Sequence, residues 1–352
     1  MMKMVHRPSR GVTLRVLFLI ACFALAMTIY RMHSDPQTQS LSPCRLPTWR
    51  DTRTTTTTPQ TNATRVTMTT VARTNAARRH LLRQRCQLYG EANATSASSG
   101  KWKSRLLVVD KYKLVYCSVP KAGNTNWKRV LLSLLLPSGG RPPETVSFHE
   151  AHHSPSLLRP LSSYPSDDQQ SIMRTYYKFV FARDPLSRLL SAFRNKVLGV
   201  GGVDDNHRKL LVPLLMRGRG DVGDAWTEFR RKPPTLAEFV DYVIQCHERR
   251  GTLNVHWSPV ADLCNVCGVD YDFVGKMETV ADDARFVLAV HGLADVVVYP
   301  ERRDTGYEAA EETAGELRRE YQGIPARDLA KIVAMFAKDF DVFNYSLFDH
   351  YV

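Results

Sequence analysis

The chain has 352 residues, which allows one large domain or two small ones with appended segments. It carries 48 Lys and Arg against 35 Asp and Glu, a formal net charge of +13. This surplus disfavours a basic partner and favours an anionic one, namely nucleic acid, a membrane surface or an acidic substrate, without selecting among these.

The first predicted element is a membrane anchor over residues 12–30. Its core, VLFLIACFALAMTIY at 16–30, is uncharged, and four basic residues ending at Arg15 precede it. The positive-inside bias therefore leaves a cytosolic tail, 1–11, and sends the rest of the chain across the membrane. The alternative is a cleaved signal peptide, because the ALA at 24–26 fits the A-x-A cleavage pattern.

Residues 31–99 are predicted to be a disordered lumenal stem. The stretch at 51–79, DTRTTTTTPQTNATRVTMTTVARTNAARR, is rich in Thr and poor in apolar side chains, so burial could not offset the entropy cost of ordering it. Tracts rich in Thr and Pro are typical of O-glycosylated stalks. N-glycosylation sequons begin at Asn62, Asn93 and Asn344.

Six of the seven cysteines lie outside the anchor, where an oxidising lumen would favour disulfides. Cys264 and Cys267 form a C-x-x-C, which is also the pattern of a zinc half-site. No second pair stands at a suitable spacing, and His256 is a weak third ligand. We therefore expect disulfides of unknown pairing and no metal. Cys117, inside an apolar stretch, is expected to be a buried free thiol.

From residue 100 to residue 352, strand-like and helix-like stretches alternate. Strands are predicted at 105–110, 113–119, 176–182 and 271–276, and helices at 126–136, at 185–197, from the capping box at 235–238, at 282–290 and around 329–336. This alternation predicts a single α/β domain with a parallel sheet and helices on both faces, a three-layer arrangement. In such sheets ligands bind beyond the carboxyl ends of the strands.

The first strand–helix junction, YCSVPKAGNTNWKRVLLSLL at 116–135, has the composition of an anion site. Pro120 ends the strand, Lys121 adds a positive charge, and Gly123 allows close backbone approach. The helix that follows directs unpaired N–H groups at the turn. The signature of nucleotide triphosphatases, G-x-x-x-x-G-K-[ST], is absent. The alternative is a helix-capping turn with an exposed lysine.

The second junction, FVFARDPLSRLLSAFRNK at 179–196, repeats the arrangement. Arg183 ends an apolar strand, where its guanidinium could clamp a phosphate. Ser187, Arg188 and Ser191 share one face of the helix that follows. The alternative is an ordinary capped helix with surface arginines. Two such junctions in one α/β chain could bind the two ends of one nucleotide.

These two stretches resemble the signature motifs of the Golgi carbohydrate sulfotransferases, in the group of the chondroitin and dermatan 4-O-sulfotransferases and the human-natural-killer-epitope sulfotransferase. HWSPVADLCNVCGVDYDFVGKMETV at 256–280 and DFDVFNYS at 339–346 are similar to further segments of that group. The resemblance covers roughly residues 100 to 346. This chain departs from the family pattern at two places. It has Asn124 where the family commonly has Cys, and ARDP at 182–185 where the family commonly has VREP.

The resemblance implies 3′-phosphoadenosine 5′-phosphosulfate (PAPS) as sulfate donor, on a sulfotransferase fold with a P-loop-like donor site and no metal. It also implies a single-pass type II Golgi membrane protein with a lumenal catalytic domain. The first loop would hold the 5′-phosphosulfate, and Arg183 and Ser191 would be the main contacts of the 3′-phosphate. The implied donor contacts are Pro120, Lys121, Ala122, Gly123, Asn124, Thr125, Asn126, Arg183, Asp184, Pro185, Leu186, Ser187, Arg188, Leu189, Leu190 and Ser191.

Sulfuryl transfer needs a group that stabilises the leaving oxygen and a base that takes the acceptor proton. Lys121 is predicted for the first role. For the second, His152 in FHEAHHS at 148–154 comes first, His256 second and Glu278 third, the last being as plausible a structural partner of Lys276.

The expected acceptor is an acidic glycosaminoglycan, at the 4-O position of N-acetylgalactosamine in chondroitin or dermatan, or else a terminal sugar of a glycoprotein. A basic groove would attract such chains. Its candidate side chains are Arg217, Arg219, Arg230, Arg231 and Lys232. Two alternative functions are a kinase-like enzyme and an inactive, membrane-anchored glycan-binding protein. The first is disfavoured because Ala122, rather than the Ser or Thr that binds magnesium, follows Lys121. Nucleic-acid binding fits the charge but not the anchor.

Overall fold

The computed structural model describes residues 62–89, 100–136, 141–154, 156–200, 205–220, 223–251, 253–300 and 314–347. The described residues belong to one compact unit. The predicted tail and membrane anchor lie outside the described residues. Within the ranges that are described, no helix is both long and apolar enough to cross a membrane.

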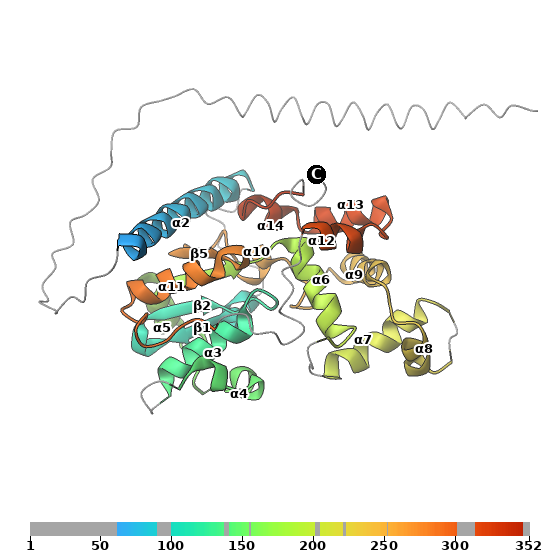
Figure 1. The fold of residues 1–352 in the computed structure, drawn as a ribbon, viewed down its shortest axis with the longest axis horizontal. Helices are drawn as coiled ribbons and strands as arrows, with labels where there is room; N and C mark the ends of the chain where they lie inside the picture. Colours follow the sequence, from blue (N-terminus) through green and yellow to red (C-terminus); the bar gives the residue numbers. More distant parts are fainter. Residues whose placement is uncertain are drawn as a thin grey trace, which may run out of the picture. The chain divides into compact units, whose positions relative to one another are not determined.

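A five-stranded sheet lies at the centre of the unit, in the order β3-β1-β2-β4-β5 (Figure 1). Its strands are β1 (Leu106–Val109), β2 (Leu114–Cys117), β3 (Arg159–Pro160), β4 (Tyr177–Ala182) and β5 (Phe273–Lys276). The four strands predicted from the sequence are confirmed, and the two-residue edge strand β3 was not predicted.

The sheet is mixed, so the expectation of an all-parallel sheet is wrong. β4 pairs in parallel with β2 and with β5, but β1 is antiparallel to both β2 and β3. The reason is the link between β1 and β2. It consists of the short 3-10 helix at Asp110–Tyr112 and Lys113 with φ 51°, and a parallel partner would need a crossover of a dozen residues or more.

Helices cover both faces of the sheet, as the sequence predicts. The helices of the unit are α2 (Asn62–Leu88), α3 (Asn124–Leu135), α4 (Phe148–His153), α5 (Ser166–Thr175), α6 (Pro185–Lys196), α7 (Asp205–Arg217), α8 (Ala225–Arg231), α9 (Leu236–Arg250), α10 (Val260–Leu263), α11 (Val280–Val290), α12 (Ala314–Tyr321), α13 (Ala326–Met335) and α14 (Ala337–Val342). On one face, α3 and α11 pack on alternate strand residues such as Tyr116 and Phe179. On the other, α2, α5, α10 and α14 cover the intervening residues, such as Val115 and Val180.

A third cluster of buried residues lies beside the sheet and is built mainly from helices. It joins α6 to α7, α8, α9, α12 and α13 through side chains that include Leu189, Phe239 and Ile332. The capping box predicted at 235–238 is present: the Thr235 hydroxyl accepts from the Glu238 N–H, and the Glu238 carboxylate accepts from the Thr235 N–H. It starts α9, whose apolar face enters this cluster.

Residues 62–88 form the long helix α2, so the prediction of a disordered stem is wrong for this part of the chain. Val71, Leu82 and Cys86 are buried, and α2 contacts β5, α11 and α14 (Figure 1). The Asn75 side chain donates to the Asp272 carbonyl at 2.9 Å and accepts from the Val274 N–H at 3.0 Å. Few apolar residues suffice here, because polar side chains bond directly to the backbone of the edge strand.

Two disulfides confirm the expectation for the cysteines, and one overturns the prediction for Cys117. Cys117 is bonded to Cys264, and Cys86 is bonded to Cys267. Cys117 is therefore not a free thiol. The C-x-x-C after α10 sends one sulfur to the end of β2 and the other to α2, which ties both elements to one short segment.

Candidate active site

The two predicted anion segments lie side by side because they follow neighbouring parallel strands. Cys117 of β2 pairs with Val180 of β4, so both chains leave the sheet at the same edge. Beyond that edge, Arg183 Nη1 donates to the Lys121 carbonyl oxygen at 3.4 Å. The structure thus brings the lysine loop and the arginine together, as expected for the switch-point edge of an α/β sheet.

The first loop is held in an unusual backbone conformation. Lys121 has φ 70°, which is rare for a residue other than glycine, and Gly123 also has φ 70°. A Cβ on Gly123 would lie 2.5 Å from the Tyr299 hydroxyl and 2.9 Å from the Met277 sulfur. The loop therefore requires glycine for its conformation and for the space around it, and strained backbone of this kind concentrates at ligand sites.

α3 begins directly at this loop and presents an uncapped positive end. The first hydrogen bond of the helix runs from the Trp127 N–H to the Gly123 carbonyl at 3.0 Å. Its N-cap is a glycine, without a capping side chain, and its first turn has no acidic residue. The N–H groups of Asn124, Thr125 and Asn126 precede that first bond, so they have no partner within the helix. Such an end suits a phosphate or sulfate.

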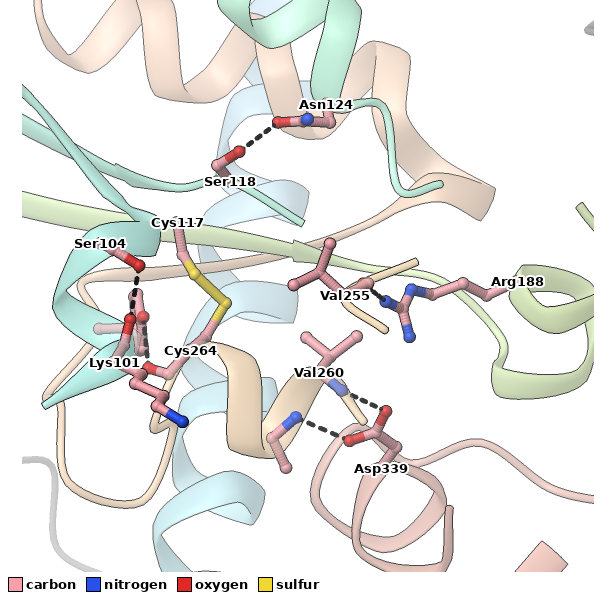
Figure 2. The surroundings of a disulfide bond; sticks show 12 residues. Lys101, Ser104, Cys117, Ser118, Asn124, Arg188, Val255, Val260, Cys264 and Asp339 are labelled. Carbon is pink, nitrogen blue, oxygen red and sulfur yellow. Dashed lines mark hydrogen bonds between the residues drawn. A yellow bond between two sulfur atoms is a disulfide. The ribbon is translucent and has the colours of Figure 1, made fainter. Parts of the chain in front are cut away.

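The Asn124 side chain does not face the helix end. It is buried, and its Oδ1 accepts a hydrogen bond from the Ser118 hydroxyl at 2.8 Å (Figure 2). Asn126 Oδ1 accepts a long bond of 3.4 Å from Arg129. The Asn124 side chain supports the loop and the Asn126 side chain bonds within α3, so the backbone N–H groups are what remain for an anion. Ala122 is also buried.

The start of α6 differs from that of α3, because its end is already capped by a carboxylate. The Asp184 side chain accepts from the Ser187 N–H at 2.8 Å, and Pro185 occupies the first helical position. An anion at this junction would therefore be bound by side chains, of which Arg183 and Ser191 are the candidates. The side chains of Leu186, Leu189 and Leu190 are buried in the core, so these three do not reach a ligand.

Arg188, predicted among the donor contacts, is instead a buried link between backbone segments. Its Nε donates to the Pro120 carbonyl at 3.0 Å and its Nη1 to the Ser258 carbonyl at 2.6 Å. Nη2 donates to the Val255 carbonyl at 3.1 Å (Figure 2). The residue is 1 % exposed, and burial lowers the pKa of its guanidinium to about 10. Its donors face carbonyl oxygens rather than the space beyond the loop.

His152, the first of the three predicted bases, lies beside the Lys121 loop. A capping box at Ser147 and Glu150 starts α4, and this short helix brings His152 Nε2 to 3.1 Å from the Thr125 hydroxyl oxygen. Burial, with the positive charges of Lys128 and Lys196, lowers the pKa of the imidazole to about 4. The ring is therefore neutral at physiological pH.

His256 reaches the same region from the segment before α10. Its Nδ1 lies 2.7 Å from the Asn254 side-chain oxygen, and its ring packs edge-on against His207 at 4.7 Å between centroids. Burial, followed by the charges of Lys196, His207, Lys121 and Arg188, lowers its pKa to about 2. This ring is also neutral at physiological pH.

Glu278, the third predicted base, has a structural role, and its partners differ from those expected. One oxygen accepts from the Asp184 N–H at 3.1 Å and the other from the Tyr345 hydroxyl at 2.9 Å. Lys276, the expected partner, instead donates to the Asn344 carbonyl and lies over the Tyr345 ring. The glutamate thus positions the start of α6.

Arg219, one of the side chains predicted to form a basic groove, is instead paired with acidic residues of the fold. Its guanidinium forms ion pairs with Glu238 at 2.6 Å and Glu228 at 3.1 Å. Arg231 also pairs with Glu228. The side chains of these two arginines support the connection of α8 to α9. Of the five side chains predicted for the groove, Arg217, Arg230 and Lys232 are left as candidates for acceptor binding.

Several residues at the site were missed by sequence reasoning. Tyr299 and Met277 close on Gly123, and Lys196, at the end of α6, is buried near both histidines. Only Lys196 carried a usable signal, because it closes the second motif. Tyr299 follows a stretch with no motif, and its hydroxyl donates a 3.4 Å bond to the Gly123 carbonyl across 176 positions.

Comparison with known proteins adds an independent finding. Residues 104–346 match the family described as Sulfotransferase family. The chain is 31% identical to carbohydrate sulfotransferase 9 of Homo sapiens, over 79% of this chain and 60% of the relative. It is 32% identical to carbohydrate sulfotransferase 8 of Homo sapiens, over 78% and 63%, and to carbohydrate sulfotransferase 11 of Rattus norvegicus, over 78% of each.

The match thus spans less than two thirds of the length of the first two relatives. No solved structure gives a significant match.

Proposed function

This chain belongs to the sulfotransferase family, and we propose that it moves the sulfuryl group of PAPS to a sugar hydroxyl. The observation that carries the proposal is the meeting of the Lys121 loop with Arg183 at one edge of the sheet. Two cationic side chains and an uncapped helix end stand there together, as a donor with phosphate groups at both ends requires. Similarity to proteins named carbohydrate sulfotransferases supports a sugar acceptor.

The residues of the two junctions fit the donor. Gly123 keeps the loop free of a Cβ, so backbone N–H groups at the start of α3 can approach the 5′-phosphosulfate. Arg183 and Ser191 would hold the 3′-phosphate. When bound, the donor supplies the sulfuryl group and the phosphate leaving group. The remaining predicted contacts support the loop or the core.

Lys121 and the N–H groups of the loop are proposed to stabilise the negative charge that develops on the leaving oxygen. A neutral histidine is proposed to accept the proton of the sugar hydroxyl. His152 and His256 both meet this requirement, because the pKa of each is lowered to about 4 and about 2 respectively. No protein nucleophile is required, because such transfer depends on alignment and charge stabilisation.

For the acceptor we propose the 4-O position of N-acetylgalactosamine in chondroitin or dermatan. A terminal sugar of a glycoprotein glycan is the second candidate. The charge of +13 supports a polyanionic chain.

For location we propose the Golgi membrane, with the unit from Pro59 onward on the lumenal side. The two disulfides support an oxidising compartment.

Binding of 3′-phosphoadenosine 5′-phosphate (PAP) tests the proposal against an inactive glycan-binding protein of the same fold. The full chain in detergent should bind PAP in titration calorimetry, and Lys121→Ala should weaken the binding. Lys101 is exposed and belongs to the 3-10 helix Lys101–Arg105, outside both junctions, so Lys101→Ala is the matched control and should bind as the wild type does. If wild-type protein does not bind PAP, the proposed enzyme activity is wrong.

A further inference from the structure

One buried guanidinium holds the two segments that carry Lys121 and His256. Arg188 donates to the carbonyl of Pro120 at 3.0 Å and to that of Val255 at 3.1 Å. The residue after each of these carbonyls is Lys121 in one segment and His256 in the other. Because one planar guanidinium binds both carbonyl oxygens, these oxygens lie within a few Å of each other. The backbone at Lys121 therefore lies next to the backbone at His256.

Hydrogen bonds fix the segment that carries His256 both before and after this residue. After it, Arg188 also donates to the Ser258 carbonyl at 2.6 Å. The buried carboxylate of Asp339 then accepts from the N–H groups of Val260 and Ala261, both at 2.7 Å (Figure 2). The Cys117–Cys264 disulfide ties the end of this segment to the strand that precedes the donor loop. Its place relative to Lys121 is therefore set by buried bonds.

The orientation of the His256 ring is also determined. The Asn254 side-chain oxygen accepts from the His256 backbone N–H at 3.0 Å and lies 2.7 Å from ring Nδ1. An oxygen in this place is an acceptor, so Nδ1 carries the ring hydrogen. In a neutral ring Nε2 then has the free lone pair, which is the form that a base requires.

His152 is used differently, although it lies beside the same loop. Its Nε2 is already within hydrogen-bond distance of the Thr125 hydroxyl at 3.1 Å, and Thr125 stands in the first turn of α3, at the proposed donor site. This contact makes His152 suited to positioning Thr125.

We propose that His256 is the catalytic base, and that Arg188 and Asn254 are positioning residues that hold it beside the donor loop. The inference rests on the proposed sulfuryl transfer. In the step, the sugar hydroxyl gives its proton to His256 Nε2 and its oxygen forms the new S–O bond. The bond from sulfur to the phosphate oxygen breaks, and its electron pair stays on that oxygen. The imidazolium then releases the proton to water.

The electrostatics around His256 agree with this role. Burial lowers the pKa of the ring most, and the charges of Lys196, His207, Lys121 and Arg188 lower it further; of these, His207 packs edge-on against the ring. With no anion bound, these groups and burial keep the ring neutral. A negatively charged donor beside Lys121 would offset the cations and raise the pKa of the ring. Proton affinity would therefore increase when the donor arrives.

The test compares His256→Gln with His152→Gln in the full chain in detergent. Loss of a general base costs roughly 100- to 10,000-fold in rate, so we expect His256→Gln to lower kcat by that factor with PAP affinity within about threefold of wild type. His152→Gln should instead weaken PAP binding and keep more of kcat. A His256→Gln enzyme with wild-type kcat would overturn the inference while leaving the proposed function intact. A wild type that sulfates no acceptor would overturn both.

A second readout does not depend on activity. In protein with ¹⁵N-labelled histidine rings, the His256 signal, assigned by its loss in His256→Gln, should report a neutral ring with hydrogen on Nδ1 at pH 6. Asn254→Ala leaves the buried links of Arg188 in place and should shift the ring toward the other tautomer, with a lower kcat and unchanged PAP affinity. An Asn254→Ala enzyme with wild-type tautomer and kcat would remove Asn254 from the positioning role. A His256 ring that is charged at pH 6 without donor would overturn the base assignment.

Discussion

Arg183 Nη1 and the Lys121 carbonyl oxygen are 3.4 Å apart across 62 positions of the chain. This contact joins the two motifs into one site. It exists because β2 and β4 are neighbours in register, with Cys117 opposite Val180, so that the loop after each strand emerges at one edge. The same contact predicts that neither motif binds the donor fully without the other.

Arg183→Met should therefore weaken PAP binding. A hydrogen bond to a charged group contributes about 1.5–3 kcal/mol, so we expect the dissociation constant to rise by roughly 10- to 100-fold. Arg174 is exposed near the end of α5, and Arg174→Met is the matched control. Titration calorimetry with PAP measures both. Equal affinities for the two variants would contradict the assignment of the 3′-phosphate to Arg183.

Gly123→Ala should reduce both donor binding and stability. Any side chain at φ 70° is strained, and here the new Cβ would also meet the Tyr299 hydroxyl at 2.5 Å. Gly251, the C-cap of α9, has φ 61° with nothing within 4 Å of its Cβ position, so Gly251→Ala carries the strain alone, on the order of 1 kcal/mol. Thermal unfolding and PAP titration of the two variants separate strain from crowding. If Gly123→Ala behaves like Gly251→Ala in both assays, the close packing of the loop is not functional.

Asp339 should make stability depend on acidity. Burial raises the pKa of its carboxyl to about 6 from the model-peptide value of 3.8, so the folded state binds a proton more tightly than the unfolded state does. Its contribution is complete below about pH 4 and is lost as the pH rises through 6. About two pKa units correspond to on the order of 3 kcal/mol.

Urea unfolding of wild type and Asp339→Asn between pH 4 and pH 7.5 measures this effect. The free energy of unfolding of wild type, relative to that of the variant, should fall as the pH rises. A difference that is constant over this range would show that Asp339 does not titrate as described.

Helix α2 should be required for folding. A chain that starts at residue 100 lacks the buried Val71, Leu82 and Cys86 and the 2.7 Å ion pair of Arg78 with Asp283. It also lacks the Cys86–Cys267 disulfide, and loss of a native disulfide typically costs 2–5 kcal/mol. We expect such a chain to be unfolded or insoluble, and a chain that starts at residue 62 to unfold cooperatively. Circular dichroism on heating compares them. Equal melting temperatures would mean that α2 is an accessory.

Local signals made most of the compact unit predictable. Apolar runs indicated β1, β2, β4 and β5, and the capping box at Thr235 indicated the start of α9. The two motifs indicated two strand–helix junctions, because a strand end, a turn and a helix start are all local in sequence.

Long-range contacts made the rest unpredictable. Arg188 looks like a ligand contact in its motif, yet its carbonyl partners lie 67 to 70 positions away. The pairing of Cys117 with Cys264 has no signal in the spacing of the cysteines. For α2, the low apolar content led to the wrong prediction of a disordered stem. The helix is instead held by polar side chains, because Asn75 and Arg78 bond to the backbone at β5 and Arg78 also bonds to Asp283.

Transfer of radiolabelled sulfate tests the central claim most directly. The full chain is supplied with labelled PAPS and with desulfated chondroitin, dermatan or glycans ending in N-acetylgalactosamine, beside Lys121→Ala and the control Lys101→Ala. We predict label on one acceptor class, retained with Lys101→Ala and lost with Lys121→Ala. Label that is independent of Lys121, or no label on any acceptor by a protein that does not bind PAP, would contradict the account.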